Sequence, residues 1–323
     1  MTRIRLGVIG LGAMGSEMLR VAKEHPEYDV VVAADADPDA RERAQRTHRG
    51  LRVVTSADDV LAAALDAVYV ATPPRTHAGL VLPALERSLA VFCEKPLAID
   101  LADGELLASA AATARVATGV NFALSDRAAV LEVERALAAG EVGKPRSVEV
   151  RLAFPDWPRA FQADATWLAE AEQGGFLREV FSHFAYLTDR ILGDLTPAWQ
   201  EVSRPRPDAA ETAAVGLFVA GGVPVRVWAE SGSARPEIYE WTLHGSKRSY
   251  RLTDWGDLAT STGGSWEPAK VAGERGSEHT RLSAFAAAVR GEPTTNLADF
   301  PTALRVQRVV EGWLRNPAPS PGR

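Results

Sequence analysis

Lys95, Glu179 and His183 carry the side chains of this chain that best suit proton transfer and charge stabilisation. A histidine has the pKa for reversible proton transfer near neutral pH. A lysine can donate a hydrogen bond to an oxygen on which negative charge develops. Glu179 precedes His183 by four residues, so on a helix it would lie one turn away and could orient the imidazole or bind a substrate hydroxyl. Together these groups suit the oxidation of an alcohol or the reduction of a carbonyl.

The stretch 174–193, "GGFLREVFSHFAYLTDRILG", predicts a helix around the acid and the histidine. Its apolar residues share one face, as expected for a period of 3.6 residues. The polar residues of the opposite face are Glu179, His183, Tyr186 and Arg190. An amphipathic helix normally exposes its charged face to water, so this stretch alone favours an ordinary solvated surface.

A glycine-rich turn near the start of the chain gives a second chemical signal. The sequence "GLGAMG" has G-x-G-x-x-G spacing, in which the glycines allow a tight turn, close approach of a pyrophosphate and close helix–strand packing. The phosphate would bind at the N-terminus of the following helix. A strand pattern precedes the turn and a helix pattern follows it, which is the context that dinucleotide binding requires. The predicted contacts are Gly10, Leu11, Gly12, Ala13, Met14 and Gly15.

Asp35 ends the second predicted strand, twenty residues after Gly15. A carboxylate at this place accepts hydrogen bonds from the ribose hydroxyls of NAD and repels the 2′-phosphate of NADP. NAD is therefore favoured over NADP. Two alternatives stay open: Asp35 is an ordinary turn acid in "DADPD", or Arg41 and Arg43 fold back to receive a phosphate.

Two further loops follow the fourth and fifth predicted strands, "ATPPRTH" at 71–77 and "CEKP" at 93–96. Ligands of open α/β sheets bind beyond the carboxyl ends of the strands, where both loops would lie. Their predicted cofactor contacts are Thr72, Pro73, His77, Glu94 and Lys95. The simpler interpretations are that the histidine caps a helix and that Lys95 is a surface charge. Cys93 is expected to pack as a small buried hydrophobe.

The elements that would position these residues alternate between strand and helix over the first 120 residues. Short runs rich in β-branched residues are each followed by a helical pattern; they lie at 3–10, 28–35, 51–54, 67–72 and 89–94. Such alternation predicts a doubly wound parallel sheet of the Rossmann type with right-handed crossovers. We expect this dinucleotide-binding domain to span residues 1–123.

The alternation stops after about residue 124. A predicted helix at 128–139 precedes several strand-like runs between 146 and 254, two of them linked through "AGG" as a hairpin. This predicts an α+β domain over residues 124–323, with a mostly antiparallel open sheet and helices on one face. A helix at 303–314 closes the fold and a frayed tail follows at 316–323.

Composition excludes several classes of protein. The 323 residues are 46% hydrophobic and 24% charged with a net charge of −6, which is globular and lacks the basic footprint of a nucleic-acid binder. No apolar run reaches the ~18 residues of a membrane span. The six histidines are scattered without metal-ligand spacing. No signal segment is evident in "MTRIRLGVIG" and there is a single cysteine, so we expect a cytoplasmic protein without a metal.

Taken together, these motifs resemble the glucose–fructose oxidoreductase / inositol dehydrogenase / rhizopine catabolism (Gfo/Idh/MocA) family. The matching pieces are "GVIGLGAMG", the acid in "VVAADADPDARERA", "ATPPRTH", "CEKPLAIDLADGELL", "GVNF" and "LAAGEVGKPRSVEV". The resemblance covers essentially the whole chain. It implies a cofactor role for Asn121 on the sixth strand and a homodimer or homotetramer built through the second domain.

The resemblance also changes the interpretation of the helix at 174–193. The family carries a "GGG-x-x-x-D-x-x-x-H" helix that faces the nicotinamide, and Glu179 and His183 match its acid and its histidine. Glu179 stands where aspartate is usual, Tyr186 where a second aspartate often follows, and Ser88 where a turn glycine is common. The extra methylene of Glu179 implies a different substrate geometry.

The resemblance therefore implies an NAD-dependent oxidoreductase that transfers a hydride to or from a sugar, cyclitol or related polyol. Lys95, His183 and Glu179 would be its catalytic residues. Arg127, Trp157, Arg159 and Arg178 are candidate substrate contacts. Three alternatives remain: a glycoside hydrolase of the same family that uses NAD transiently, a non-enzymatic NAD-binding regulator, and a reductase of imines or double bonds.

Overall fold

The computed structural model describes residues 2–162 and 164–315. The predicted tail at 316–323 lies outside them. The chain forms two compact units, which we describe separately. The first contains Met1–Phe122 and Gly276–Leu304, and the second contains Ala123–Arg275 and the chain from Arg305 onward.

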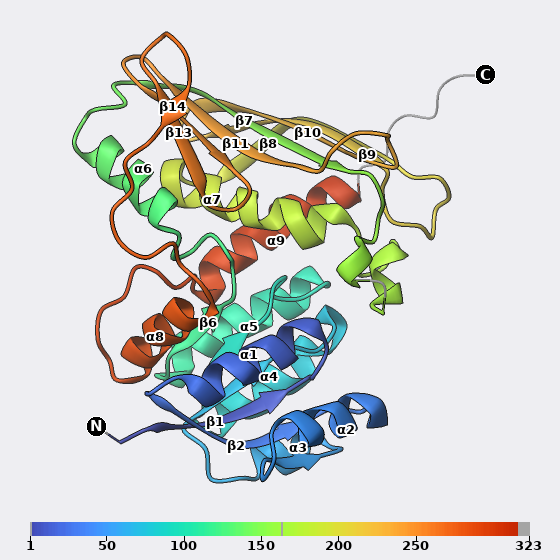
Figure 1. The fold of residues 1–323 in the computed structure, drawn as a ribbon. Helices are drawn as coiled ribbons and strands as arrows, with labels where there is room; N and C mark the ends of the chain where they lie inside the picture. The colour runs from blue at the N-terminus through green and yellow to red at the C-terminus, as the bar shows by residue number, and fades with distance from the viewer. Residues whose placement is uncertain (1, 163, 316–323) are drawn as a thin grey trace. The chain divides into compact units, whose positions relative to one another are not determined.

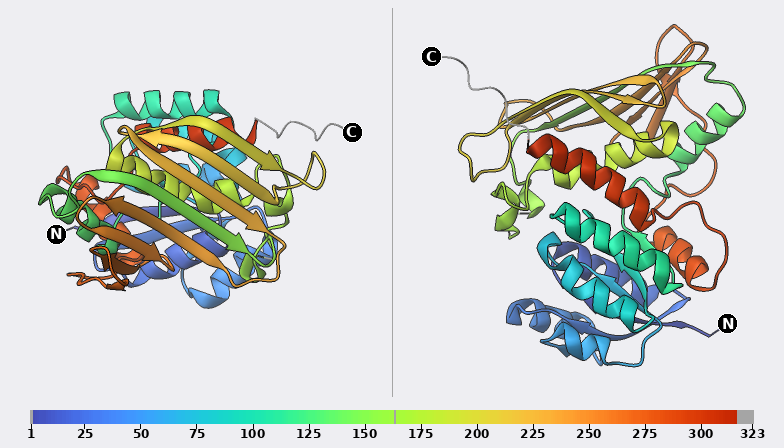
Figure 2. Two further views of the ribbon diagram at one scale, coloured as in Figure 1. Left: turned by 90° about the horizontal axis from the view of Figure 1, so that it is seen from above. Right: turned by 180° about the vertical axis from the view of Figure 1, so that it is seen from behind.

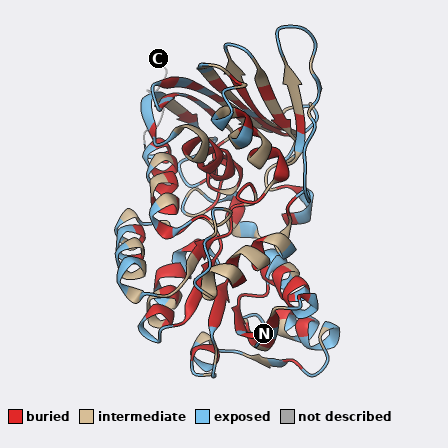
Figure 3. Cartoon of the chain, turned by 90° about the vertical axis from the view of Figure 1, so that its left-hand side faces the viewer, coloured by how far each residue is buried: buried red, intermediate tan, exposed pale blue. Residues whose placement is uncertain are grey.

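The first unit is built on a parallel six-stranded sheet (Figure 1). Its strands are β1 (Ile4–Ile9), β2 (Tyr28–Ala34), β3 (Arg52–Val54), β4 (Ala67–Val70), β5 (Ala90–Cys93) and β6 (Thr118–Val120). Their order is β3-β2-β1-β4-β5-β6, so the direction of winding changes between β1 and β4. The residues of β1, β4 and β5 are almost all buried, because helices cover both faces of the sheet (Figure 3). The predicted doubly wound parallel sheet is confirmed.

The helices of this unit are α1 (Ala13–Glu24), α2 (Pro38–Thr47), α3 (Ala57–Leu61), α4 (His77–Glu86), α5 (Leu101–Ala114) and α8 (Glu278–Val289). Asp37, Asp100 and Ser277 cap α2, α5 and α8 through their side chains. The N-cap residue of α1 is Gly12, so this helix has no side-chain cap. Helix α4 also lacks such a cap, as does α6 (Ala128–Ala138) in the second unit.

Helix α8 belongs to the first unit, although it follows in sequence the strands of the second. Leu282, Phe285 and Ala286 join the core of α1 and the parallel sheet, where Phe285 stacks on Phe92. The hydroxyl of Tyr28 donates a hydrogen bond to the carbonyl oxygen of Leu282 at 2.7 Å. The expected domain 124–323 therefore differs from the observed unit in segment 276–304, because no local pattern announces these distant contacts.

The second unit is built on an eight-stranded sheet with the order β14-β13-β12-β11-β7-β10-β9-β8 (Figure 2). Its strands are β7 (Pro145–Phe154), β8 (Leu195–Ser203), β9 (Ala213–Ala220), β10 (Val223–Ser231), β11 (Ile238–Gly245), β12 (Ser249–Thr253), β13 (Asp257–Ser261) and β14 (Glu267–Pro268). Neighbours are antiparallel except β7 and β10. The predicted open sheet and the hairpin between β9 and β10 are confirmed, whereas β13 and β14 were not predicted.

Helices α6 (Ala128–Ala138), α7 (Ser182–Leu192) and α9 (Phe300–Leu314) belong to the α+β arrangement, with α7 and α9 against one face of the large sheet (Figure 2). Trp241 on that face donates a hydrogen bond to Thr188 of α7 at 3.0 Å. Trp313 of α9 packs edge-on against Phe181 and Phe218. The outer face keeps exposed apolar residues on β8 and β9: Trp199, Val215, Leu217 and Val219.

The segment predicted as a plain amphipathic helix differs from the prediction in two ways. Residues Leu177–Phe181 form a π-helical turn, and only Ser182–Leu192 is α-helical. Every residue from Ser182 to Asp189 is buried, so the polar face is not a solvated surface. The interpretation as an ordinary exposed helix face is therefore wrong.

Candidate functional site

Each glycine of "GLGAMG" meets a different demand of the backbone. Gly10 has φ +97°, and a Cβ there would lie 2.5 Å from the carbonyl oxygen of Ala71. A Cβ on Gly15 would lie 1.9 Å from the carbonyl oxygen of Gly10. A Cβ on Gly12 would meet open space. The first and third glycines thus allow turn and packing, and the second leaves its surroundings open to a ligand.

The N-terminus of α1 suits a phosphate group. No side chain caps it, and its first turn contains no acidic residue. Backbone N–H groups at such an end attract anions, as does the helix dipole. Leu11 packs its side chain into the core, whereas Met14 is exposed. These residues fit the pyrophosphate of a dinucleotide.

Asp35 lies at the end of β2 and reaches the glycine loop. Its carboxylate accepts hydrogen bonds from the backbone N–H groups of Leu11 (2.6 Å) and Asp37 (2.8 Å). A carboxylate has about four acceptor sites, so these bonds leave capacity for ribose hydroxyls. Arg41 folds back, but onto the carbonyl oxygens of Asp35 and Ala36. Arg43 lies 3.9 Å from the carboxylate of Asp37.

His77 is fully buried and connects the loops after β4 and β5. Its Nδ1 lies 3.0 Å from the carbonyl oxygen of Pro96, and its Nε2 lies 2.9 Å from that of Thr72. Burial lowers the pKa of this imidazole. The side chain therefore holds the two loops together, and Pro73, which is exposed, is better placed to contact a ligand.

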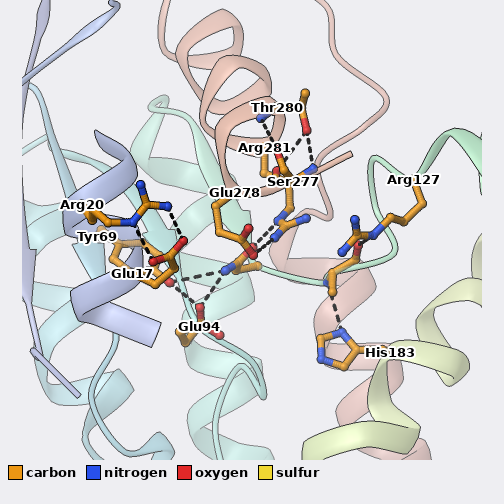
Figure 4. A network of polar contacts seen from close by, with 12 residues as sticks. Glu17, Arg20, Tyr69, Glu94, Arg127, His183, Ser277, Glu278, Thr280 and Arg281 are labelled. Carbon is orange, nitrogen blue, oxygen red and sulfur yellow. Dashed lines mark hydrogen bonds and ion pairs between the residues drawn. The ribbon is translucent and has the colours of Figure 1, made fainter. Parts of the chain in front are cut away.

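Glu94 stands in a network of buried polar groups after β5 (Figure 4). Its Oε1 accepts hydrogen bonds from the hydroxyl of Tyr69 and from Nδ2 of Asn121, the latter at 2.7 Å. Burial, followed by the charge of Glu94, raises the pKa of Tyr69 well above its ordinary value. The backbone N–H of the half-buried Lys95 lies 3.3 Å from Glu94 Oε2. Each oxygen of the Glu94 carboxylate thus accepts at least one hydrogen bond.

The same network reaches α8 through a residue that sequence reasoning missed. Arg281 is fully buried, and its Nε donates a hydrogen bond to Oδ1 of Asn121 at 2.7 Å. Its Nη2 pairs with Glu278 at 2.5 Å. The amide of Asn121 therefore bonds to both Glu94 and Arg281, and its contact with a cofactor stays a prediction.

In the second unit, His183 is fixed at the start of α7. The backbone N–H of Ala123 donates a hydrogen bond to its Nδ1 at 3.1 Å (Figure 4). The indole of Trp255 lies at 87° to the imidazole, with the ring centroids 5.2 Å apart. The side chain of His183 is buried.

Trp255 is another residue that no sequence signal marked. It occupies the turn between β12 and β13, where both Asp254 (φ 47°) and Trp255 (φ 64°) are left-handed. A bulky residue in this region is a conformational outlier. Besides His183, the indole contacts Phe184 and Tyr239.

Glu179 lies in the π-helical turn and joins a second polar network. Its Oε1 accepts a hydrogen bond from Gln162 at 2.9 Å and lies 3.6 Å from Nη2 of Arg159. Arg159 donates further hydrogen bonds to Gln162 and to the hydroxyl of Tyr239. Its guanidinium also lies over the rings of Trp157 and Phe161. Arg159 therefore connects the carboxylate of Glu179 to Tyr239 and to two aromatic rings.

Arg178 is not available to a substrate. Its guanidinium forms a two-pronged pair with Glu311, at 2.6 and 2.9 Å, and both side chains are buried. It also donates to the carbonyl oxygens of Ala171 and Gly174. The sequence interpretation of Arg178 as a substrate contact is wrong, because its helix turns it toward α9. Arg127 donates through Nε to the carbonyl oxygen of Ala123.

The carboxylate of Glu211 binds the first residue of the π-helical turn. Its Oε1 accepts a hydrogen bond from the backbone N–H of Leu177 at 2.7 Å. A Cβ on Gly175 would lie 2.2 Å from its Oε2, so glycine is required there. Burial raises the pKa of this carboxyl.

The described residues also lack the features of two other classes of protein, metalloproteins and membrane-spanning proteins. They contain no group of three or more His, Cys, Asp or Glu side chains that could hold a metal ion. None of the helices within 2–162 and 164–315 is long and apolar enough to cross a membrane. Cys93 is buried, and burial raises its pKa well above the ordinary value.

Two family models match the chain. The model of the Gfo/Idh/MocA "oxidoreductase family, NAD-binding Rossmann fold" covers residues 4–122. The model of the GFO/IDH/MocA C-terminal domain covers residues 130–251.

Curated relatives give partial matches. "Inositol 2-dehydrogenase 4" of Saccharopolyspora erythraea is 35% identical over 145 residues, covering 44% of this chain and 43% of the relative. "Rhizopine catabolism protein MocA" of Rhizobium meliloti is 34% identical over 123 residues, covering 38% of each. "1,5-anhydro-D-fructose reductase" of Ensifer adhaerens is 32% identical over 148 residues, covering 45% of this chain and 44% of the relative. Each of these matches spans less than half of the relative's length.

Solved structures share the whole fold. An oxidoreductase from Agrobacterium radiobacter, in complex with NAD+, L-tartaric acid and magnesium, has a TM-score of 0.83 at 18% identity, covering 98% of this chain and 97% of that one. An oxidoreductase domain protein from Kribbella flavida has a TM-score of 0.81 at 24% identity, with 97% and 96% covered. Both domain models match the chain, and they do so in the order of the two domains. The chain therefore belongs to the Gfo/Idh/MocA oxidoreductase family.

Proposed function

We propose that this protein is an NAD-dependent oxidoreductase acting on a hydroxyl of a sugar, cyclitol or related polyol, or on the corresponding carbonyl. The observation that carries the proposal is the uncapped N-terminus of α1, with open space at Gly12 and the carboxylate of Asp35 beside the loop. When bound, NAD supplies the hydride acceptor. The names of the relatives, which are dehydrogenases and a reductase, support the substrate class.

The preference for NAD over NADP rests on Asp35. Its carboxylate repels a 2′-phosphate, and the guanidinium of Arg41 is bonded to backbone carbonyl oxygens. Gly10, Leu11, Gly12, Ala13 and Met14 would hold the pyrophosphate. Thr72, Pro73 and Glu94 lie at the carboxyl ends of β4 and β5, where a nicotinamide would be held in this fold.

Lys95, His183 and Glu179 are proposed as the catalytic residues. Lys95 follows the anchored Glu94 and supplies a cation that stabilises negative charge on the reacting oxygen. His183 provides a buried imidazole with a fixed orientation. Glu179, held by Gln162 and Arg159, binds a substrate hydroxyl.

The experiment is a screen of cyclitols, sugars and sugar acids with NAD, following NADH at 340 nm, with Lys95→Met as the control. Net NADH formation by the wild type alone supports the proposal. Glycoside cleavage that needs NAD but gives no net NADH indicates the hydrolase of the same family. NAD binding without turnover of any compound indicates a regulator.

We propose that the outer face of the large sheet joins copies of this chain into a homodimer or homotetramer. Leu217 and Trp199 are 44% and 48% exposed and are paired across β9 and β8. An apolar stripe of this kind on a sheet is typical of a protein interface. Val225 and Val227 of β10 are buried and do not belong to this stripe.

A cytoplasmic location is also proposed, on the strength of Cys93. This thiol is buried in β5, within the sheet that would hold the cofactor. Free thiols persist in a reducing compartment. Fractionation of producing cells would locate the protein.

A further inference from the structure

A buried arginine of α8 lies at one end of the polar network around Glu94 (Figure 4). Arg281 is 1% exposed, and its Nε donates a hydrogen bond to Oδ1 of Asn121 at 2.7 Å. Nδ2 of Asn121 donates in turn to Oε1 of Glu94, also at 2.7 Å. The side-chain amide of Asn121 therefore joins the guanidinium to the carboxylate within the first unit.

The amide of Asn121 can join these two groups in only one orientation. A guanidinium has donors and no acceptor, whereas an ionised carboxylate has acceptors and no donor. The oxygen of the amide must therefore face Arg281, and its nitrogen must face Glu94. If the amide were turned by 180°, two donors would meet at Arg281 and two acceptors would meet at Glu94. The hydrogen bond from Arg281 thus fixes the donor that reaches Glu94.

The same carboxylate oxygen accepts a second hydrogen bond. The hydroxyl of Tyr69 donates to Oε1 of Glu94, and Nδ2 of Asn121 lies 3.4 Å from that hydroxyl. Burial and then the charge of Glu94 raise the pKa of Tyr69, and the charge of Arg281 acts against this rise. The guanidinium is therefore close enough to act on the residues around Glu94.

The attachment of α8 to the parallel sheet does not depend on this arginine. Leu282, Phe285 and Ala286 pack into the core of the first unit, where Phe285 stacks on Phe92. Taking a guanidinium out of water is costly, and apolar residues of similar volume often replace buried ion pairs without loss of stability. Stability alone therefore does not explain why Arg281 is an arginine.

We propose that Arg281 is a positioning residue of the cofactor site, which holds the carboxylate of Glu94 in place through the amide of Asn121. This inference rests on the proposed function, in which Glu94 contacts the bound dinucleotide. A side chain that is already fixed loses little further freedom when a ligand binds, so the affinity for the ligand is higher. Segment 276–304 thereby contributes to a site whose predicted contacts all lie within the first 122 residues.

Two replacements of Arg281 differ in the donor that they offer to Asn121. In Arg281→Gln, the amide nitrogen is bonded to Cδ, as Nε is in arginine, so it can donate to Oδ1 of Asn121. In Arg281→Met, a methyl group takes the place of Nε and cannot donate. Both replacements remove the charge and the ion pair with Glu278. The difference between the two variants therefore reports the hydrogen bond to Asn121.

The first experiment observes the amide of Asn121 without a cofactor. The chain contains three asparagines, Asn121, Asn296 and Asn316, so ¹⁵N labelling of asparagine gives three side-chain amide groups. The signals of Asn121 are assigned by their loss in Asn121→Asp. We expect these amide protons to exchange with solvent ~10-fold faster in Arg281→Met than in the wild type or in Arg281→Gln, because a hydrogen bond is lost. Equal exchange in the three proteins would overturn the proposal.

The second experiment measures the affinity for NAD by titration calorimetry. We expect Arg281→Met to bind ~5-fold more weakly than the wild type and Arg281→Gln to recover the affinity to within ~2-fold, because ordering one side chain on binding has a cost of this size. Ser283→Ala removes a 2.9 Å contact between the same helix and His25, so it is the control and should bind NAD as the wild type does.

A double replacement tests whether Arg281 acts through Asn121. In an Asn121→Ala background, Arg281→Met should weaken NAD binding no further, because the connection to Glu94 is already lost. An undiminished loss in that background, or equal affinities of the methionine and glutamine variants, would overturn the proposal.

Circular dichroism checks that each variant is folded, and Arg281→Leu removes the same donor if the methionine variant is not folded. A wild type that binds no NAD would refute the proposed function. The exchange of the amide protons decides separately, without NAD, whether Arg281 holds Asn121.

Discussion

Asp35 accepts a hydrogen bond from the backbone N–H of Leu11 at 2.6 Å, which ties the end of β2 to the glycine loop. One carboxylate therefore both shapes the loop and presents negative charge beside it. A cofactor with a phosphate on its ribose would meet this charge.

The first prediction concerns that charge. Wild-type protein should bind NADH at least ~5-fold more tightly than NADPH, about 1 kcal/mol. Asp35→Ala should narrow the ratio toward one, because it removes the repulsion. Asp37→Ala, which loses the cap of α2, is the control and should keep the ratio. Titration calorimetry measures both affinities, and equal or tighter NADPH binding by the wild type would contradict the assignment.

A second prediction separates the network around Glu94 from ordinary burial. Tyr69→Phe removes a hydroxyl that donates to Glu94, and should lower the free energy of unfolding by about 1–3 kcal/mol. It should also weaken NAD binding, because the "EKP" loop loses an anchor. Tyr28→Phe removes a buried hydroxyl that donates to Leu282 and should cost similar stability without changing NAD affinity. Urea denaturation and calorimetry test both; parallel behaviour of the two variants would refute a special role for Tyr69.

The third prediction is a pH dependence of stability from Glu211. Burial raises its pKa in the folded state above the ordinary value of 4.5, so the folded protein binds more protons than the unfolded chain between the two pKa values. The stability contributed by this group is present below pH 4.5 and is lost as the pH rises through the folded pKa. Relative to Glu211→Gln, the wild type should therefore lose stability with rising pH in urea denaturation series. If the free energy of unfolding of the wild type relative to Glu211→Gln stays constant or increases with pH, the carboxyl ionises at least as easily in the folded protein as in water.

The fourth prediction tests the outer sheet face. Leu217→Lys places a charge in the middle of the apolar stripe and should shift the assembly toward monomer. Val271→Lys, at an exposed valine outside the stripe, is the control. A monomeric wild type at micromolar concentration, measured by light scattering, would contradict the proposed interface.

The fifth prediction grades the catalytic residues. Lys95→Met should lower kcat by ~10²-fold or more, because it removes a group that stabilises charge on the reacting oxygen. Glu179→Gln should be milder, since glutamine can keep a hydrogen bond to a substrate hydroxyl and loses only the charge that pairs with Arg159. Steady-state kinetics at saturating NAD decide; comparable rates for Lys95→Met and the wild type would remove this lysine from the mechanism.

Local patterns were sufficient to predict the parallel sheet and the glycine loop. The residues of "GLGAMG" act within one turn, and the acid of Asp35 follows at the end of the next strand, so spacing alone relates them. Burial of the β-branched runs follows from their composition. These features depend on neighbours in sequence.

Long-range partners were beyond such patterns. Arg281 and Asn121 are 160 residues apart in sequence, and neither segment has a local pattern that predicts their hydrogen bond. A tryptophan with positive φ contradicts local preference, so Trp255 at His183 could not be expected. Arg178 illustrates the opposite error: a polar residue near the predicted site proved to be one half of a buried pair with Glu311.

The placement of α8 also has a consequence for how the chain is made. The core of the first unit needs Leu282, Phe285 and Ala286, and its buried Arg281 bonds to Asn121. These residues are synthesised after almost all of the second unit, at a pace of about 5–20 residues per second. The nascent first 122 residues must therefore wait, with the apolar face of α1 uncovered, for roughly 8–30 s before α8 emerges. The part that is synthesised first is thus completed late, and its exposed apolar surface makes this interval the one most prone to aggregation.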